Sequence, residues 1–215
     1  MACSLDLSGV WSLKSSEWKE ETIPGKIPDP HYGRNELAVQ EFRRYDWEYS
    51  RDFDVPAELL GYEHVYLTAE MVDTFATVFI NGRKVLSGEN MFTRYRTDVK
   101  AALRPGSNRI EIRFKSAENE AKKAAAEQPF PVPMNGCSKV PNLNLNRKVH
   151  CHGGWDWGLT LMVTGVYMPL TLTGVNTARI DYLYADQKHE KNRVTVTAVA
   201  ELFAEKAGKL PVAFR

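Results

Sequence analysis

Apolar and polar residues alternate along four segments of the chain, which cover 46–55, 64–70, 107–114 and 192–203. A period of two is typical of strands that bury one face and expose the other. The segment 161–175 adds two further β-rich pieces. Many short strands, with turn signals about every ten residues, indicate a β-sandwich. The expected fold class is therefore all-β.

Two elements have a strong local signature. Residues 75–86 form two strand-like arms around Asn81 and Gly82, and a turn of this type needs the positive φ that Asn and Gly adopt most readily. This pattern predicts a β-hairpin. The segment 116–128 predicts a surface helix, because Ser116 can cap it and acidic residues crowd its first turn.

The longest stretch without periodicity covers residues 129–148 and contains four prolines and four asparagines. A loop of about twenty residues is long for a compact domain, and such loops are usually functional or disordered. Residues 176–215 hold only two or three predicted strands, which cannot bury a sandwich core by themselves. We expect a first domain over 1–175 and the incomplete beginning of a second over 176–215.

The charge balance bears on the choice of partner. The 28 Lys and Arg residues are matched by 27 Asp and Glu residues, so the net charge of +1 gives no argument for nucleic acid or an anionic membrane. No apolar run approaches the ~20 residues of a transmembrane helix. The unfinished strands of 176–215 leave edges through which a homo-oligomer or a crystal pairing would form.

Three features favour a cytoplasmic location. The first residues, MACSLDLSGVW, lack the basic and apolar regions of a secretory signal peptide. The three cysteines, Cys3, Cys137 and Cys151, are an odd and sparse set that suits free thiols in a reducing compartment. No Asn-x-Ser/Thr sequon occurs.

The segment 152–160, HGGWDWGLT, holds the most distinctive candidate site, and we call it the WDW loop. Trp155 and Trp157 flank Asp156, and the surrounding glycines favour an irregular loop in which all three side chains face one ligand. An indole packs on the apolar face of a pyranose, and a carboxylate accepts hydrogen bonds from adjacent hydroxyls. This set of groups suits a sugar. The structural alternative is a core tryptophan pair, with Asp156 as a turn-former or cap.

His150, Cys151 and His152 look at first like metal ligands. On a strand, this spacing places the two imidazoles on one face and the thiol on the other. A structural zinc needs four ligands, and no C-x-x-C or H-x-x-x-H pattern supplies the rest. We therefore expect no metal and no cofactor, and His152 is either a hydrogen-bonding group near a ligand or an inert strand residue.

Two further pairs are ambiguous. Arg147 and Lys148 are either a solvated basic pair or, through Arg147, a means to orient Asp156 or to reach a sugar hydroxyl. Asp73 and Thr74 begin a hairpin arm and suit a turn. No catalytic carboxyl pair can be nominated, although retaining glycoside hydrolysis needs two carboxyl groups about 5–5.5 Å apart.

Four motifs, in this order, resemble the N-terminal region of β-mannosidases of glycoside hydrolase family 2. They are DPHYGRNE at 29–36, YDWEYSRDF at 45–53, DTFATVFINGRKV at 73–85 and RKVHCHGGWDWG at 147–158. The resemblance spans residues 8–175 and continues more weakly to the end of the chain. One departure lies at Gly153, where the family usually has Phe, and this predicts a less anchored loop.

The resemblance implies a jelly-roll, galactose-binding-like β-sandwich over 1–175 and the start of an immunoglobulin-like β-sandwich over 176–215. It also implies that the catalytic glutamates belong to a (β/α)8 barrel outside this chain. The WDW loop would then help to shape the pocket for a terminal mannose, with Arg147 and His152 in the same substrate-binding set.

The expected function is that of the N-terminal, non-catalytic part of a retaining exo-β-mannosidase, with a β-mannoside oligosaccharide or glycan as its partner. Two alternatives stay open, namely a stand-alone carbohydrate-binding module and another family 2 exo-glycosidase of the β-galactosidase or β-glucuronidase type. A reading frame that continues for several hundred residues, with an Asn-Glu pair at a strand end, would favour the enzyme over the module.

Overall fold

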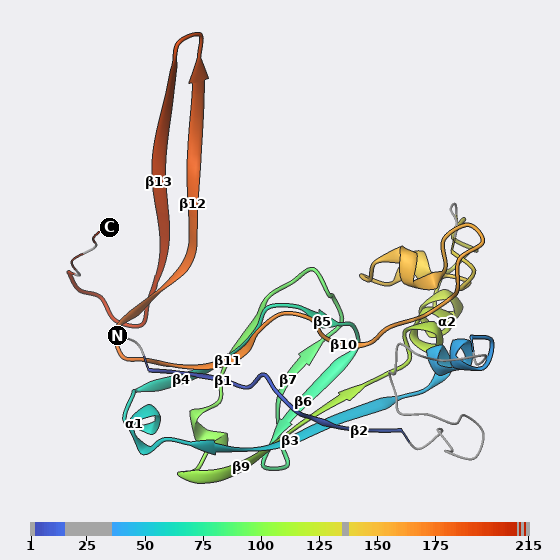
Figure 1. The fold of residues 1–215 in the computed structure, drawn as a ribbon, viewed down its shortest axis with the longest axis horizontal. Coiled ribbons are helices and arrows are strands. Elements are labelled where there is room, and N and C mark those ends of the chain that lie inside the picture. Colours follow the sequence, from blue (N-terminus) through green and yellow to red (C-terminus); the bar gives the residue numbers. More distant parts are fainter. Residues whose placement is uncertain (1–2, 16–35, 135–137, 210, 212, 214–215) are drawn as a thin grey trace.

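The computed structural model describes residues 3–15, 36–134, 138–209, 211 and 213. Strands dominate this part of the chain and form an all-β sandwich, as the alternation of apolar and polar residues predicts (Figure 1). Every ladder between the described strands is antiparallel.

The sandwich consists of two main sheets. The four-stranded sheet has the order β1 (Ser4–Asp6), β11 (Leu170–Val175), β4 (His64–Ala69) and β8 (Tyr95–Asp98). The five-stranded sheet has the order β2 (Ser12–Lys14), β3 (Trp47–Val55), β9 (Gly106–Phe114), β6 (Ala76–Ile80) and β7 (Arg83–Gly88). Sequence periodicity identifies the longer strands β3, β4 and β9 to within a residue or two of their ends.

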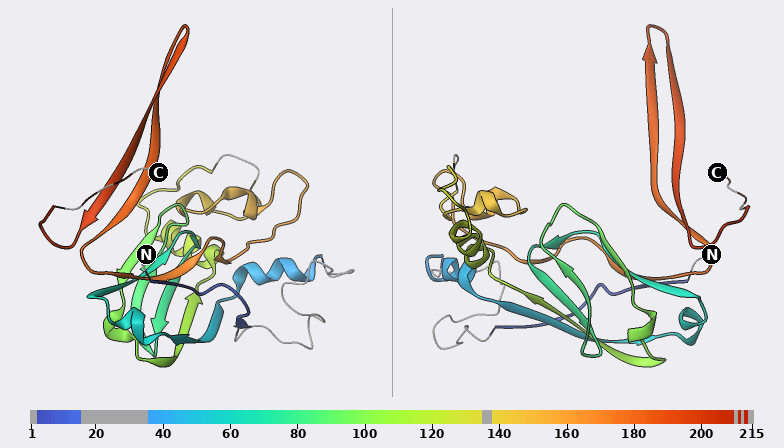
Figure 2. Two further views of the ribbon diagram at one scale, coloured as in Figure 1. Left: turned by 60° about the vertical axis from the view of Figure 1, so that its left-hand side comes forward. Right: turned by 180° about the vertical axis from the view of Figure 1, so that it is seen from behind.

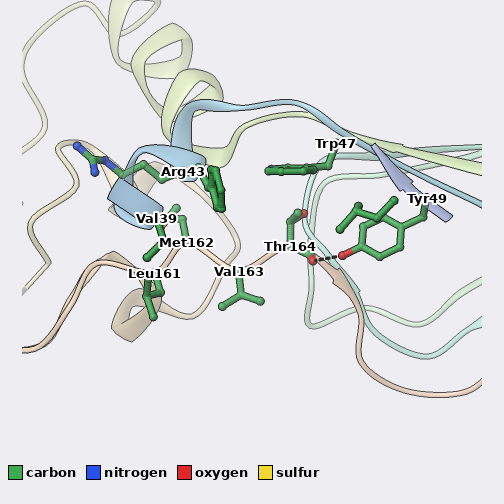
Figure 3. Close-up of a pocket in the computed structure, with 10 residues that line it drawn as sticks. Val39, Arg43, Trp47, Tyr49, Leu161, Met162, Val163 and Thr164 are labelled. Carbon is green, nitrogen blue, oxygen red and sulfur yellow. Dashed lines mark hydrogen bonds between the residues drawn. The ribbon is translucent and has the colours of Figure 1, made fainter. Parts of the chain in front are cut away.

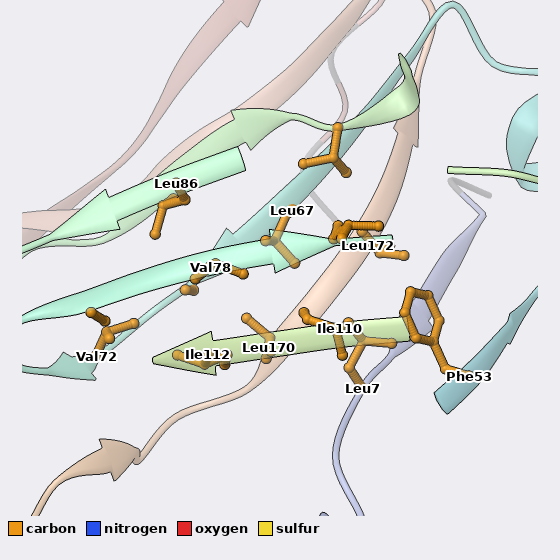
Figure 4. Close-up of a cluster of buried hydrophobic side chains, with 14 of the residues drawn as sticks. Leu7, Phe53, Leu67, Val72, Val78, Leu86, Ile110, Ile112, Leu170 and Leu172 are labelled. Atoms are coloured by element: carbon orange, nitrogen blue, oxygen red, sulfur yellow. The ribbon is translucent and has the colours of Figure 1, made fainter. Parts of the chain in front are cut away.

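The hydrophobic core lies between these two sheets (Figure 4). Leu67 pairs with Leu172 in the four-stranded sheet, and Ile80 pairs with Ile110 in the five-stranded sheet. All four side chains are fully buried. Burial of an aliphatic side chain of this size stabilises the fold by about 1.5–3 kcal/mol, so apolar burial holds the two layers together.

Both elements with a strong local signature are present. The turn between β6 and β7 places Asn81 at a φ of 50° and Gly82 at a φ of 78°, which confirms the hairpin. The predicted helix is α2 (Ala117–Ala126), and the Ser116 hydroxyl caps it by accepting a hydrogen bond from the amide of Asn119 at 3.2 Å. Its packing face is thin, as expected, and buries Ala121.

The other helices are short: η1 (Ala38–Arg44), α1 (Ala57–Leu60), η2 (Lys100–Ala102), η3 (Leu143–Leu145) and η4 (His150–Gly153). Buried Glu118 of α2 joins that helix to η1, because its carboxylate accepts hydrogen bonds from Arg43 Nε and Lys122 Nζ, both at 2.7 Å. Among the described residues, no helix combines the length and apolar character that spanning a membrane requires.

A small two-stranded sheet lies at the end of the sandwich that carries the WDW loop. It pairs β5 (Val72–Asp73) with β10 (Gly165–Val166), so that Asp73 lies opposite Gly165. Segment 138–164 and α2 occupy this end of the molecule, far from the last two strands (Figures 1 and 2). β10 therefore follows directly on the segment that contains the candidate site.

The last two strands, β12 (Ala178–Glu190) and β13 (Arg193–Ala204), form a separate hairpin that stands away from the sandwich (Figure 2). Strand β13 confirms the strand predicted over 192–203, and most side chains of the hairpin are exposed. At its base, Arg179 pairs with Glu205 at 3.0 Å and Arg96 pairs with Asp181. The division into domains 1–175 and 176–215 stays a prediction.

Candidate functional site

The three central residues of the WDW loop lie in a tight turn on the surface. The Gly158 amide donates a hydrogen bond to the Trp155 carbonyl at 2.7 Å, and Asp156 has a φ of 47°. The exposed fraction is 64% for Trp155 and 94% for Trp157. The alternative of a core tryptophan pair is therefore wrong, whereas its other part, Asp156 as a turn-former, is confirmed. Two exposed indoles beside an exposed carboxylate form a surface that is suited to a ligand.

Gly153 and Gly154, which precede this turn, lie in close contact with neighbouring residues. A Cβ atom on Gly153 would lie 2.2 Å from Ser138 Oγ and 2.6 Å from the Leu143 side chain. Gly154 has a φ of 94°, and a Cβ there would lie 2.9 Å from Thr160 Oγ1. The backbone can approach its neighbours this closely only because neither residue has a side chain.

Hydrogen bonds on both sides of the turn anchor the loop. The Lys139 amide donates to the Gly153 carbonyl at 2.6 Å, and Lys139 Nζ donates to the Gly158 carbonyl at 2.7 Å. The Thr160 amide donates to Gln40 Oε1 at 3.2 Å. Because Gly153 stands where the family usually has Phe, the sequence predicts a less anchored loop. In the structure, hydrogen bonds to the backbone of Gly153, Gly158 and Thr160 hold the loop instead.

We expect Gly153→Ala to lower the free energy of unfolding by about 1–3 kcal/mol, because the new methyl group overpacks the contact with Ser138 and Leu143. Urea denaturation measures the change. Gly208→Ala is the matched control, because a Cβ at Gly208 meets nothing within 4 Å. Equal stability of the two variants would show that the loop shifts freely to accommodate a side chain.

The prediction that His150, Cys151 and His152 lie on a strand is wrong. They lie in η4, a 3₁₀ helix, so the two imidazoles do not share a strand face. Cys151 is exposed, and His152 is half-buried with its Nδ1 3.4 Å from Asp73 Oδ2. Among the described residues, no group of three or more His, Cys, Asp or Glu could hold a metal ion. Local turn formation after Val149 has overridden the extended pattern.

Arg147 and Lys148 have opposite environments, which corrects the view of them as one solvated pair. Arg147 is exposed, and its guanidinium carbon lies 5.9 Å from the centre of the Phe92 ring. No ion pair joins Arg147 to Asp156 in the described structure. The Lys148 side chain is only 1% exposed. Arg147 and Lys148 differ in burial because this segment is irregular and has no regular alternation of side chains between two faces.

Buried Lys148 pairs with Asp73, which is also fully buried and is not a turn residue on the surface. Lys148 Nζ lies 2.5 Å from Asp73 Oδ2, and the Tyr167 hydroxyl donates to the same oxygen at 3.2 Å. Burial by itself raises the pKa of Asp73, but polar contact with His152 and the charge and hydrogen bond of Lys148 outweigh it, so the pKa lies below its ordinary value. Burial beside this carboxylate raises the pKa of Tyr167.

An apolar pocket lies under the segment that leaves the WDW loop (Figure 3). Trp47 and Tyr49 line it together with residues 161–164, and the Tyr49 hydroxyl donates to the Thr164 carbonyl at 3.0 Å. Its volume of ≈ 100 Å³ is well below the roughly 300–1,000 Å³ of small-molecule sites. This pocket is therefore too small to compete with the exposed turn as a site of sugar contact.

The motif at 29–36 contributes to the family resemblance but lies, except for Glu36, outside the described residues. The sequence therefore places Trp155, Asp156 and Trp157 together, and the structure adds Asp73 and Lys148, which sequence reasoning missed. The sequence does contain a signal for the burial of Asp73, because this charged residue lies inside the largely apolar run 71–80.

Comparison with known proteins gives a consistent family. Residues 19–168 match the family model described as glycosyl hydrolase 2 galactose-binding domain-like. The chain is 37% identical to "Beta-mannosidase B" of Thermothelomyces thermophilus over 188 residues, which is 85% of this chain and 21% of that protein. It is 34% identical to "Beta-mannosidase A" of Emericella nidulans over 201 residues, with the same two coverages.

Solved structures agree on the fold. The crystal structure of a β-D-mannosidase from Dictyoglomus thermophilum matches with a TM-score of 0.79 at 28% identity, over 94% of this chain and 26% of that one. A β-D-glucuronidase from the same organism matches with a TM-score of 0.54 at 16% identity, over 95% of this chain and 33% of that one, which indicates the fold alone. The chain spans about a fifth of the length of the two fungal relatives.

Proposed function

Because the chain belongs to the glycosyl hydrolase 2 galactose-binding domain-like family, we propose that it is the N-terminal, non-catalytic part of a retaining exo-β-mannosidase. The whole protein would hydrolyse terminal β-linked mannose, and this part would position the substrate. The relatives named β-mannosidase favour a mannoside over a glucuronide as the substrate. The solved β-glucuronidases share only 14–18% identity with the chain.

The observation that carries the proposal is the exposed turn of Trp155, Asp156 and Trp157. Exposing the apolar surface of two indoles to water is unfavourable, and a ligand or a partner surface would cover them. The indole faces suit the C–H face of a pyranose, and the Asp156 carboxylate accepts hydrogen bonds from its hydroxyls. A catalytic barrel outside this chain would supply the glutamates of the reaction.

Arg147 and His152 are proposed to complete the substrate-binding set. Arg147 is exposed, so its guanidinium is free to donate to a sugar hydroxyl. His152 keeps 20% of its side chain exposed, and the other side of its imidazole faces Asp73. The hairpin β12–β13 is proposed to begin an immunoglobulin-like domain, because its long strands leave apolar side chains such as Leu183 exposed.

Asp156→Ala in the whole enzyme tests the proposal. The loss of a charged acceptor of sugar hydroxyls costs about 1.5–3 kcal/mol, so kcat/KM should fall about 10–150-fold. The melting temperature should stay nearly unchanged, because Asp156 is exposed.

Asp54→Ala is the matched control, since Asp54 is an exposed aspartate of the sandwich, near the end of β3 that leads into α1. It should leave both kcat/KM and the melting temperature unchanged. An Asp156→Ala enzyme that melts much earlier, while kcat/KM per folded molecule is unchanged, would make Asp156 structural and remove this site.

A further inference from the structure

One buried carboxylate lies where the chain enters and leaves the WDW loop. Asp73 Oδ2 lies 2.5 Å from Lys148 Nζ, which precedes the loop. The same oxygen lies 3.4 Å from His152 Nδ1 at the start of the loop, and it accepts a hydrogen bond from the Tyr167 hydroxyl, beyond the loop, at 3.2 Å. A single oxygen atom therefore contacts the chain before, at and after the loop.

Three further contacts close the same junction. Lys148 Nζ also donates to the Val163 carbonyl at 2.6 Å, so one ammonium group joins the segments on either side of the loop. The Thr164 hydroxyl donates to the Asp73 carbonyl at 2.6 Å. In the ladder of β5 and β10, Asp73 lies opposite Gly165. Side chain and backbone of Asp73 thus bind the segment that leaves the loop.

This arrangement fixes the span of the loop. A loop whose two ends are tied at one point has fewer conformations than one with free ends. The exposed turn has little apolar packing of its own, since Trp155 and Trp157 are mostly in solvent. Its position relative to the sandwich therefore depends on the backbone contacts of Gly153, Gly158 and Thr160 and on the junction at Asp73.

We propose that Asp73 and Lys148 are positioning residues, which hold both ends of the WDW loop so that its indoles and Asp156 meet the sugar in one orientation. This inference rests on the proposed function of the loop. Neither side chain reaches the sugar, because Asp73 is 0% exposed and Lys148 is 1% exposed.

A buried ion pair suits this role better than an apolar contact of equal size. Apolar contacts have no direction, whereas the ammonium of Lys148 must satisfy two acceptors, Asp73 Oδ2 and the Val163 carbonyl, at once. Misplacing either end of the loop leaves a buried charge without its partner, which is strongly unfavourable. The pair therefore favours one position of the two loop ends over positions in which either end is shifted.

The test is native-state proteolysis of the full chain by chymotrypsin, which cleaves after aromatic residues such as Trp155 and Trp157 and more slowly after leucine. Cleavage within 149–163 reports local opening of the loop, because cleavage requires several residues to leave the fold together. Asp73→Asn should raise the initial rate of this cleavage about 10-fold or more under conditions where the chain stays folded. Tyr167→Phe, which removes one hydrogen bond to Asp73, should raise it less.

Glu118→Gln is the matched control. Glu118 is a second buried carboxylate with cationic partners, and its side chain is 5% exposed, but it joins α2 to η1 instead of the loop. It should lower stability without raising cleavage in 149–163. If loop cleavage in Asp73→Asn and Glu118→Gln follows the melting temperature in the same way, the Asp73 pair is merely structural and the inference is overturned.

The double variant Asp73→Asn/Lys148→Met keeps the inference testable if Asp73→Asn alone fails to fold. It removes both charges, and such replacements are often tolerated by the fold. It should fold, yet its loop should still be cleaved faster than in the native chain. A folded double variant with native loop cleavage would also overturn the inference.

An activity measurement separates this inference from the proposed function. In the whole enzyme, the double variant should lose kcat/KM toward a β-mannoside, while Glu118→Gln should retain it. Faster loop cleavage with unchanged kcat/KM would support the junction as a holder of the loop and contradict the role of the loop in sugar binding. Native loop cleavage would contradict the inference whatever the activity.

Discussion

Purified residues 1–215 are expected to release no nitrophenol from a nitrophenyl β-mannoside. Retaining hydrolysis needs two carboxyl groups about 5–5.5 Å apart that both reach the glycosidic bond. Two buried carboxylates of the described chain, Asp73 and Glu118, are held by cationic partners and are closed to a sugar. The fungal relatives are nearly five times as long as the region they share with this chain.

The expected effect is large, because enzymes accelerate their reactions by at least about a millionfold, and all of this would be absent. The measurement compares the chain with a mock purification from the same host, so that a contaminating host glycosidase is recognised. Turnover that exceeds the mock sample and follows the chain through a second purification step would contradict the prediction. It would also place a catalytic carboxyl pair within residues 1–215.

The sequence predicts the long strands well, because each buries one face and therefore alternates. Strands β3, β9 and β13 and the hairpin at Asn81-Gly82 follow from local patterns alone. Strands β1 and β2 do not, because three residues are too few to display a period. Their existence depends on pairing with β11 and β3, which are distant in sequence.

The candidate site, too, can be predicted from local sequence only in part. The exposed turn follows from its own residues, since tryptophan, aspartate and glycine in this order favour an irregular loop. The burial of Asp73 and Lys148 does not, because it depends on their contact with each other, and they are 75 positions apart in the sequence. The same applies to His152, whose neighbours Asp73 and Tyr167 come from separate segments.

Asp73→Asn is expected to lower the free energy of unfolding at neutral pH by about 3–5 kcal/mol, because it leaves the buried Lys148 charge without its partner. Urea denaturation at pH 7 measures this change. The double variant Asp73→Asn/Lys148→Met is the control, because removal of both charges should restore most of the stability. A loss of less than about 1 kcal/mol in the single variant would show that the junction is open to water.

The difference between native chain and Asp73→Asn should also depend on pH. Contact with His152, Lys148 and Thr74 lowers the pKa of Asp73 against the effect of burial, and in the unfolded chain the pKa is about 3.9. The carboxylate therefore contributes its full stability above about pH 4, and this contribution is lost as the pH falls through the lower, folded pKa. Denaturation curves from pH 7 to pH 2.5 should show the two stabilities converging only below pH 4. Convergence already between pH 7 and pH 5 would mean that Asp73 has a raised pKa and is not held by Lys148.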